Sequence, residues 1–402
     1  MSDSLKIASP EYFKAALSQL NLNQNKQATL ASIIALAYLL LPFTESVAIV
    51  MLLCCTPFVS PRHINKNGVA FLSVLLVALI AYYLVGASEN RPIINNSLQI
   101  WRVIASFVVI LALLLVSPGN AKKSVEYLCI GVVAFVFIEG ILTFIIAPDV
   151  ALARAMIKPM MGGEVGVFHS TGQINAMSLA AGFLFLLSEK QFLRSLSLAL
   201  LVVIAWMFLN RTGMIISAIY ILYWVLHAAK SRPKVFNSKR HSQLLLAIAL
   251  LLISTVLLMH PEFVPAEIKD AFLRMFFYDG LKTERYETIK IGLEQIYSGN
   301  HPFGGAQLGS EFSYPWYHNL YLDAYRVAGF PALALFLALT SISFYAVCKS
   351  NLKRLIFMWI LAFGIAMSSV PLEGLFIEYT TIFTIFTYAI SAYSSRMHSV
   401  RT

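Results

Sequence analysis

Long runs of apolar residues recur along the whole chain and constrain its fold more than any other feature. A helix needs about 20 mostly apolar residues to cross a hydrocarbon core about 30 Å thick. Charged residues make up only 12% of the chain, against roughly 25% in soluble domains. We therefore expect an all-α integral membrane protein. The runs predict about twelve transmembrane helices, near residues 28–43, 45–59, 68–86, 101–117, 126–147, 172–188, 195–209, 213–229, 243–259, 328–348, 355–371 and 377–394.

The basic residues are gathered in alternate connections between these runs. With the N-terminus inside, most of the 30 Lys and Arg residues fall on the cytoplasmic face, including the stretch KSRPKVFNSKRHS. This is the bias expected of a membrane protein, in which Lys and Arg mark the cytoplasmic loops. The net charge of +10 therefore points to membrane orientation and not to nucleic-acid binding. Both termini are predicted to be cytoplasmic.

One connection is much longer than the others and falls on the external face, over residues 260–327. Long loops are usually functional. We expect a single transmembrane domain, 1–402, with 260–327 as an embedded external subdomain. Two amphipathic helices are predicted within it, over VPAEIKDAFLRMFFY and over TERYETIKIGLEQIYSG. The second helix should end at Gly299, and its apolar face should consist of Tyr286, Ile289, Leu293 and Ile296.

Three polar residues on the predicted external face are candidates for a functional role, although each could also have a structural role. Arg211 lies in the short turn LNRTG, where it could extend to lipid headgroups or clamp a phosphate. Arg285 lies between Glu284 and Glu287, where it could form local ion pairs or a second phosphate clamp. His318 could be structural or could act as a general base, because its ordinary pKa lies near ambient pH.

The stretch PWYHNLYLDAYRVAGFPALALF changes from polar to apolar halfway, at the mouth of the predicted span 328–348. If 317–327 is helical, His318, Tyr321, Leu322 and Tyr325 share one face. Asp323 and Arg326 are three residues apart, so a local salt bridge is their simplest role. Glu139 lies inside a predicted span and needs a polar partner or a proton.

Several of these segments together resemble the bacterial O-antigen ligase and O-antigen polymerase superfamily. HNLYLDAYRVAG resembles the family motif of His-Asn, nine residues and glycine, matched by His318, Asn319 and Gly329. Ala332 stands where the family often has Gly or Thr. LNRTGMIISAIY and ERYETIKIGLEQIYSGNHPFGG are similar to the family segments that carry two arginines, matched by Arg211 and Arg285. FHSTGQINAMSLAAG resembles the asparagine-containing start of a middle span.

The resemblance implies a glycosyltransferase of the bacterial inner membrane, with its active site on the periplasmic side and no metal or other cofactor. The donor would be a glycan on undecaprenyl diphosphate. Arg211 and Arg285 would hold the diphosphate, His318 would activate the acceptor hydroxyl, and the anomeric configuration would invert. Further candidates for substrate binding are Tyr317, Asn319, Tyr321, Asp323 and Arg326.

The acceptor remains open at this point. A ligase transfers the glycan to lipid A–core, whereas a polymerase transfers it to another lipid-linked repeat; the motif and the compact length favour the ligase. A transporter or flippase is an alternative from another class. Transporters often carry midplane polar groups in two related halves, whereas this chain concentrates its polar residues on the external side.

Overall fold

The computed structural model describes residues 66–88, 118–148, 155–157, 167–208, 210–230, 284–309, 316–350, 352–368 and 376–401, with isolated residues between 29 and 51 and Phe312. The predicted spans 28–43, 45–59, 101–117 and 243–259 lie wholly or largely outside these residues. The amphipathic helix predicted over VPAEIKDAFLRMFFY also lies outside them. The predicted subdomain 260–327 is therefore described mainly in its second half.

The described residues are predominantly helical. Within them, every helix except α12 coincides with a predicted span. The helices are α3 (Lys66–Ser88), α5 (Pro118–Ile146), α7 (Ser170–Leu187), α8 (Gln191–Met207), α9 (Arg211–Lys230), α12 (Glu284–Ser298), α13 (Leu320–Ser350), α14 (Lys353–Ala366) and α15 (Phe376–Arg401). Strands β1 (Ala155–Ile157) and β2 (Val167–His169) form a small antiparallel sheet, which the sequence reading did not predict.

Among the described residues, Lys122–Ile146 and Leu320–Ser350 are long and apolar enough to cross a membrane. Shorter apolar helices accompany them over Gly68–Tyr82, Thr171–Leu187, Gln191–Met207 and Arg211–Val225. The helical class of the protein is thus confirmed, while the full set of twelve spans stays a prediction.

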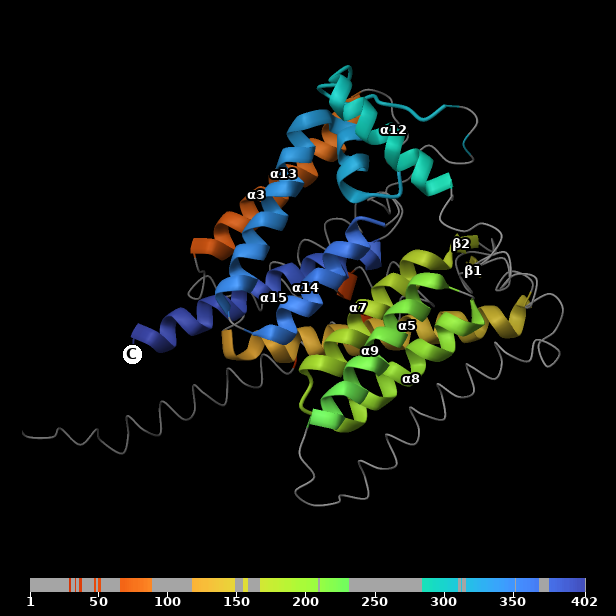
Figure 1. Ribbon diagram of the computed structural model, residues 1–402, viewed down its shortest axis with the longest axis vertical. Helices are drawn as coiled ribbons and strands as arrows, with labels where there is room; N and C mark the ends of the chain where they lie inside the picture. Colours follow the sequence, from red (N-terminus) through yellow and green to blue (C-terminus); the bar gives the residue numbers. More distant parts are fainter. Residues whose placement is uncertain are drawn as a thin grey trace, which may run out of the picture.

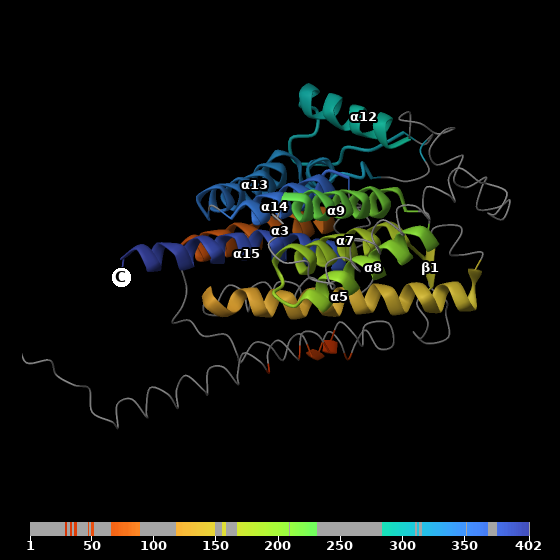
Figure 2. The same ribbon diagram turned by 60° about the horizontal axis from the view of Figure 1, so that its bottom comes forward.

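Helix α15 lies at the centre of the bundle. All its side chains from Glu378 to Ser391 are buried. Its aromatic rings pack against three neighbours, with Phe386 stacked on Trp359 of α14, Phe383 on Phe336 of α13 and Tyr388 edge-on to Phe183 of α7. Helix α12, in contrast, lies outside the bundle in both views (Figures 1 and 2).

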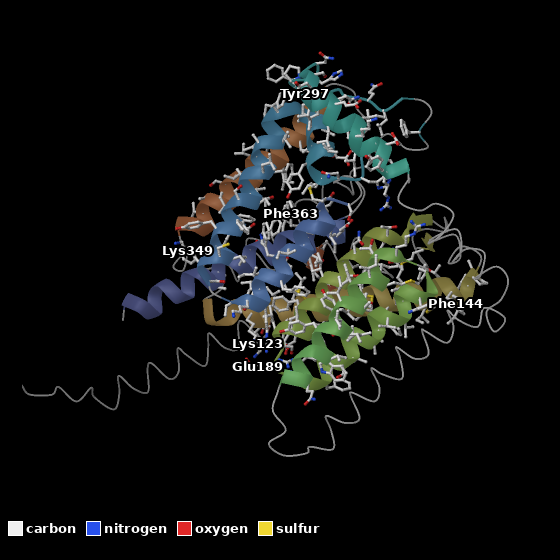
Figure 3. The ribbon with its side chains drawn as sticks, in the orientation of Figure 1. Lys123, Phe144, Glu189, Tyr297, Lys349 and Phe363 are labelled. Carbon is white, nitrogen blue, oxygen red and sulfur yellow. The ribbon has the colours of Figure 1, made fainter. Side chains whose placement is uncertain are left out.

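Basic connections gather at one end of the bundle, away from α12. The ammonium of Lys122 donates a hydrogen bond of 2.7 Å to Glu189, and Arg354 donates one of 3.1 Å to the carbonyl of Leu186. The bond from Lys122 holds the pKa of the exposed Glu189 below its ordinary value. Lys123 and Glu189 lie close together in Figure 3, far from Tyr297 on α12. The direction in which this end faces remains a prediction.

Helix α13 is broken at Ala328 and Gly329. Gly329 has φ 68° and ψ −154°, a conformation that favours glycine. A Cβ atom at Gly329 would lie 2.0 Å from the carbonyl oxygen of Pro302. The loop that contains Pro302 is docked into the break, because Phe330 N–H donates to Pro302 O at 2.9 Å and Gly305 N–H donates to Arg326 O at 2.8 Å. The family-like motif glycine and the PFGG loop therefore depend on each other.

The break separates the polar part of α13 from its apolar part. The hydroxyls of Tyr321 and Thr340 lie 2.7 Å apart, although a straight helix would place these residues about 28 Å apart along its axis. The first segment, 320–327, is therefore folded back against the second. The apolar segment 330–350 would still be about 30 Å long, enough to cross a bilayer.

The helix predicted over TERYETIKIGLEQIYSG is confirmed as α12, and Gly299 with φ 65° follows its last residue. Its apolar face is not the face that packs most closely against the α13 region. Tyr286 and Leu293 are 59% and 56% exposed, whereas Thr288 and Gly292 are buried. The physical reason is close approach: a Cβ at Gly292 would lie 3.0 Å from the Leu322 side chain. The close contact of α12 with the α13 region is therefore made at Gly292 and not by the apolar residues Tyr286 and Leu293.

Candidate functional site

His318 lies just before α13, in a buried and unusual backbone position. Its φ is 54°, and its side chain is 8% exposed. The helix begins at Leu320, so the prediction that His318 shares a helical face with Tyr321, Leu322 and Tyr325 was wrong. A histidine in the left-handed region is uncommon and must be held there by its surroundings.

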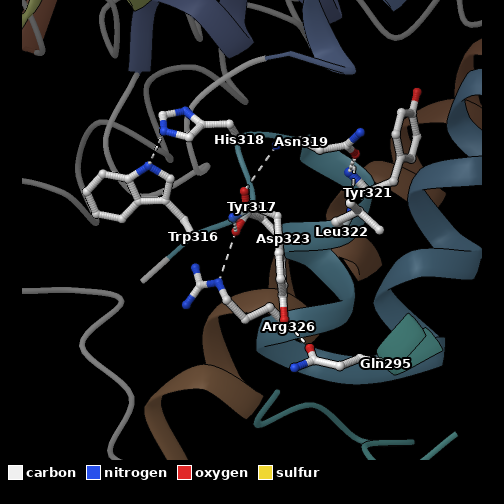
Figure 4. A network of polar contacts seen from close by, with 9 residues as sticks. All are labelled: Gln295, Trp316, Tyr317, His318, Asn319, Tyr321, Leu322, Asp323 and Arg326. Carbon is white, nitrogen blue, oxygen red and sulfur yellow. Dashed lines mark hydrogen bonds and ion pairs between the residues drawn. The ribbon is translucent and has the colours of Figure 1, made fainter. Parts of the chain in front are cut away.

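The ring of His318 is engaged by Trp316. The indole N–H of Trp316 donates to Nε2 of His318 at 3.2 Å, and the two rings meet edge to face (Figure 4). Indole can only donate, so Nε2 accepts, and a neutral imidazole then carries its proton on Nδ1. In this arrangement Nε2 cannot take a proton from a substrate hydroxyl until Trp316 moves away.

Asn319 is the N-cap of α13. Its Oδ1 accepts hydrogen bonds from the backbone N–H groups of Tyr321 at 3.0 Å and Leu322 at 3.2 Å, as N-cap asparagines do. Its Nδ2 donates to the carbonyl of Met367 at the end of α14, at 3.1 Å. Both lone pairs of the amide oxygen are thus used inside the protein. The structure places this predicted substrate-binding residue in a structural role.

Asp323 accepts hydrogen bonds from the backbone on both sides of His318. Its Oδ1 accepts from Tyr317 N–H at 3.1 Å and from Arg326 Nε at 2.9 Å, and its Oδ2 lies 3.4 Å from Asn319 N–H. The predicted salt bridge between Asp323 and Arg326 is confirmed. Because the residues on both sides of His318 bond to the same carboxylate, Asp323 helps to hold His318 in its conformation.

The two candidate tyrosines, Tyr317 and Tyr321, connect separate segments of the protein, and Tyr325 does the same. The hydroxyl of Tyr317 donates to the side-chain oxygen of Gln295 on α12, and Tyr325 donates to the carbonyl of Gln295 at 3.0 Å. Burial raises the pKa of Tyr317, so its phenol stays neutral at physiological pH. Tyr321 bonds to Thr340 in the second segment of α13.

The two candidate arginines lie on other elements, each in the first turn of a helix. Arg211, which was predicted to lie in the short turn LNRTG, is the first residue of α9. Asn210 caps this helix, because its Oδ1 accepts from Gly213 N–H at 2.8 Å. A Cβ at Gly213 would lie 2.8 Å from Ile174, so the start of α9 packs against the start of α7. Arg285 lies in the first turn of α12 and is half-buried.

Two buried residues that the sequence did not predict as site residues form a polar pair between α7 and α15. Glu378 of α15 accepts a hydrogen bond of 2.7 Å from Asn175 of α7. An acidic residue at the mouth of a predicted span is a sequence signal, and it could have identified Glu378 as it did Glu139. The pairing with Asn175 had no such signal, because the two residues are 203 positions apart.

Of the predicted residues, six lie together and the two arginines lie on other helices. Tyr317, His318, Asn319, Tyr321, Asp323 and Arg326 lie around the start of α13. Arg211 and Arg285 lie at the starts of α9 and α12. Within the described ranges, no group of three or more His, Cys, Asp or Glu side chains is arranged to hold a metal ion.

Comparison with protein-family models, with curated proteins and with solved structures finds no match for this chain.

Proposed function

We propose that this protein is a membrane glycosyltransferase that transfers a glycan from undecaprenyl diphosphate to lipid A–core, as an O-antigen ligase. The observation that carries the proposal is the position of the two arginines. Both lie in the first turn of a helix, where the helix dipole opposes a cation and favours an anion. Two guanidinium groups held against this dipole suit a bound diphosphate, because the anion interacts favourably with the charges and with the helix ends.

In the proposed reaction, the acceptor hydroxyl oxygen attacks the anomeric carbon of the donor sugar. The new carbon–oxygen bond forms as the bond to the diphosphate oxygen breaks, and the electron pair leaves with undecaprenyl diphosphate. Arg211 and Arg285 stabilise the negative charge of the leaving diphosphate. Attack from the opposite side inverts the configuration of the anomeric carbon.

His318 receives the proton of the acceptor hydroxyl in this scheme. Because Nε2 is bonded to Trp316 in the structure, we infer that Trp316 swings away when the acceptor binds and exposes Nε2. The polar network of Asn319 and Asp323 holds the backbone of His318 meanwhile. The proposed location is the bacterial inner membrane, with the site on the periplasmic face and both termini in the cytoplasm.

The proposal is tested in a strain that lacks the gene, by a lipopolysaccharide gel run beside a probe for undecaprenyl-linked glycan. Bare core with long polymer on the carrier lipid is the result expected for a ligase. Core with a single repeat would instead identify an O-antigen polymerase, which has the same chemistry and another acceptor. An unchanged ladder in the mutant would contradict both.

Complementation with variants then separates an enzyme from a transporter. A flippase that does not use His318 as a base should keep full activity in His318→Gln. The glycosyltransferase should lose most of its transfer in His318→Gln, since general-base catalysis contributes about 10²–10⁴-fold. Full complementation by this variant would contradict the mechanism.

A further inference from the structure

Three large apolar side chains are exposed where α12 ends and the following loop begins. Leu293 is 56% exposed, Tyr297 is 95% exposed and Phe303 is 72% exposed. Tyr297 lies one turn after Leu293 on the same side of α12, and its side chain projects away from the helix bundle (Figure 3). We call these three side chains the apolar tip. Exposed apolar residues that occur singly need no explanation, whereas a group of them marks a surface that something covers.

The apolar tip is attached to the start of the apolar segment of α13. The side chain of Gln295 donates to the carbonyl of Gln307 at 2.9 Å, which holds the loop against the end of α12. The N–H of Phe330 donates to the carbonyl of Pro302 at 2.9 Å. Phe303 directly follows Pro302, so this bond places the backbone of Phe303 beside the first turn of the apolar segment.

The apolar segment of α13, residues 330–350, has an exposed stripe along one side. Phe330 is 39% exposed, Leu337 is 46% exposed and Phe344 is 47% exposed, and residues seven positions apart lie on the same face of a helix. Helix α13 is long and apolar enough to cross a membrane, and lipid chains cover the exposed apolar face of a helix that does so. The stripe begins at Phe330, and the apolar tip therefore continues it beyond the break in α13.

The composition of the tip suits the boundary between lipid and water. Phe303 is purely apolar, whereas Tyr297 combines an apolar ring with a hydroxyl group. Tyrosine rings are enriched at the interfaces between membrane and water. Helix α12 has 15 residues and is too short to cross a bilayer. It runs across the direction of α13 and not alongside it (Figure 1), as a helix that lies on a membrane surface does.

We propose that the apolar tip inserts into the lipid–water interface of the membrane that α13 crosses, so that the partner of this surface is the phospholipid bilayer. Leu293, Tyr297 and Phe303 contact lipid at the depth where the stripe of α13 ends. The tip then holds the end of α12, and through Gln295 also the loop, at the membrane surface. This inference concerns how the protein lies in the membrane, and it does not depend on the proposed glycan transfer.

The proposal is tested with spin labels on the full-length protein in bilayers of phosphatidylcholine. The four native cysteines are replaced by serine, and one label is attached in Tyr297→Cys or in Phe303→Cys. Glu287→Cys, at an exposed position in the first turn of the same helix, is the matched control. Oxygen dissolves in lipid, whereas a polar nickel chelate stays in water. The ratio of the collision rates of the label with oxygen and with the chelate should therefore be about fivefold higher at 297 and 303 than at 287.

Two results would overturn the proposal. Equal ratios at 303 and 287 would show that the tip lies in water. Broadening of the spectrum at 303 that disappears on dilution with unlabelled protein would show that a second copy of the chain covers the tip instead.

A second measurement serves if the cysteine-free protein does not fold. Phe303→Trp and Glu287→Trp are made in the otherwise native chain, and the fluorescence that each adds is compared in plain and in brominated phosphatidylcholine. Bromine on the lipid chains should quench most of the fluorescence added at 303 and little of that added at 287. Equal quenching at the two positions would contradict insertion of the tip.

Discussion

Two polar regions of this protein use their side chains in opposite ways. Around the start of α13, the side chains of Asn319, Asp323 and Tyr317 form hydrogen bonds within the protein. Near the starts of α7 and α15, one buried oxygen of Asn175 and one of Glu378 accept no bond from the described residues, and the start of α9, with Arg211 as its first residue, packs against α7. Polar side chains therefore stabilise the backbone in the first region, whereas buried acceptor oxygens stay unused in the second.

The largest effect is expected from the two arginines that begin α9 and α12. Arg211→Ala and Arg285→Ala should each lower glycan transfer by about 10²–10³-fold, the usual loss when one group that stabilises developing charge is removed. The measurement is transfer of labelled glycan by purified protein. Lys290→Ala, at an exposed position of α12, is the matched control and should transfer normally. Loss of transfer in the Lys290 variant as well would mean that general surface charge matters, and not these two positions.

Gly329→Ala tests the break in α13 and should reduce stability. The new Cβ would lie 2.0 Å from Pro302 O and 2.6 Å from Gly304 N, and the left-handed backbone adds strain. A cost of about 2–4 kcal/mol is expected, seen as a lower apparent Tm in detergent. Gly364→Ala is the control: its Cβ would meet nothing within 4 Å, so it should be neutral or slightly stabilising. Equal Tm values for the two variants would contradict the docking of the PFGG loop.

Asn319→Ala tests whether the motif asparagine is structural. Loss of the N-cap should cost about 1–2 kcal/mol, whereas Asn319→Asp keeps the capping oxygen and should cost less. Thermal unfolding of both variants measures the difference. A variant that unfolds like the wild type but transfers glycan 100-fold more slowly would instead show that Asn319 contacts substrate.

The smallest effect is expected for Trp316→Phe. It removes one hydrogen bond between neutral groups, worth about 1 kcal/mol, and leaves Nε2 of His318 open. Transfer should stay within about fivefold of the wild type, or rise, because the base no longer has to be released. A fall of more than tenfold would mean that the Trp316–His318 bond belongs to the active arrangement.

The sequence was a reliable guide to elements that depend on local properties. Apolar runs predicted the positions of α3, α5, α7, α8, α9, α13, α14 and α15 within the described residues. Gly299 marked the end of α12, and the spacing of Asp323 and Arg326 predicted their salt bridge. The functional roles of His318, Arg211 and Arg285 rest on motif resemblance and remain proposals.

Other features depend on residues far apart in the chain. The face of α12 that packs against the α13 region contains Gly292, which lets the two segments approach closely. The requirement for glycine at 329 comes from the carbonyl of Pro302, which belongs to another segment.

Hydropathy and turn signals report only what a short segment prefers, and so the sequence by itself determined the helices, the basic clusters and the positions of the candidate residues. Tertiary structure decided which polar groups bond to each other. It assigned Asn319 to a helix cap, placed Trp316 on His318, and brought Asn175 and Glu378 together. A buried polar group takes whichever partner the packed helices bring within reach, and no local pattern records that partner.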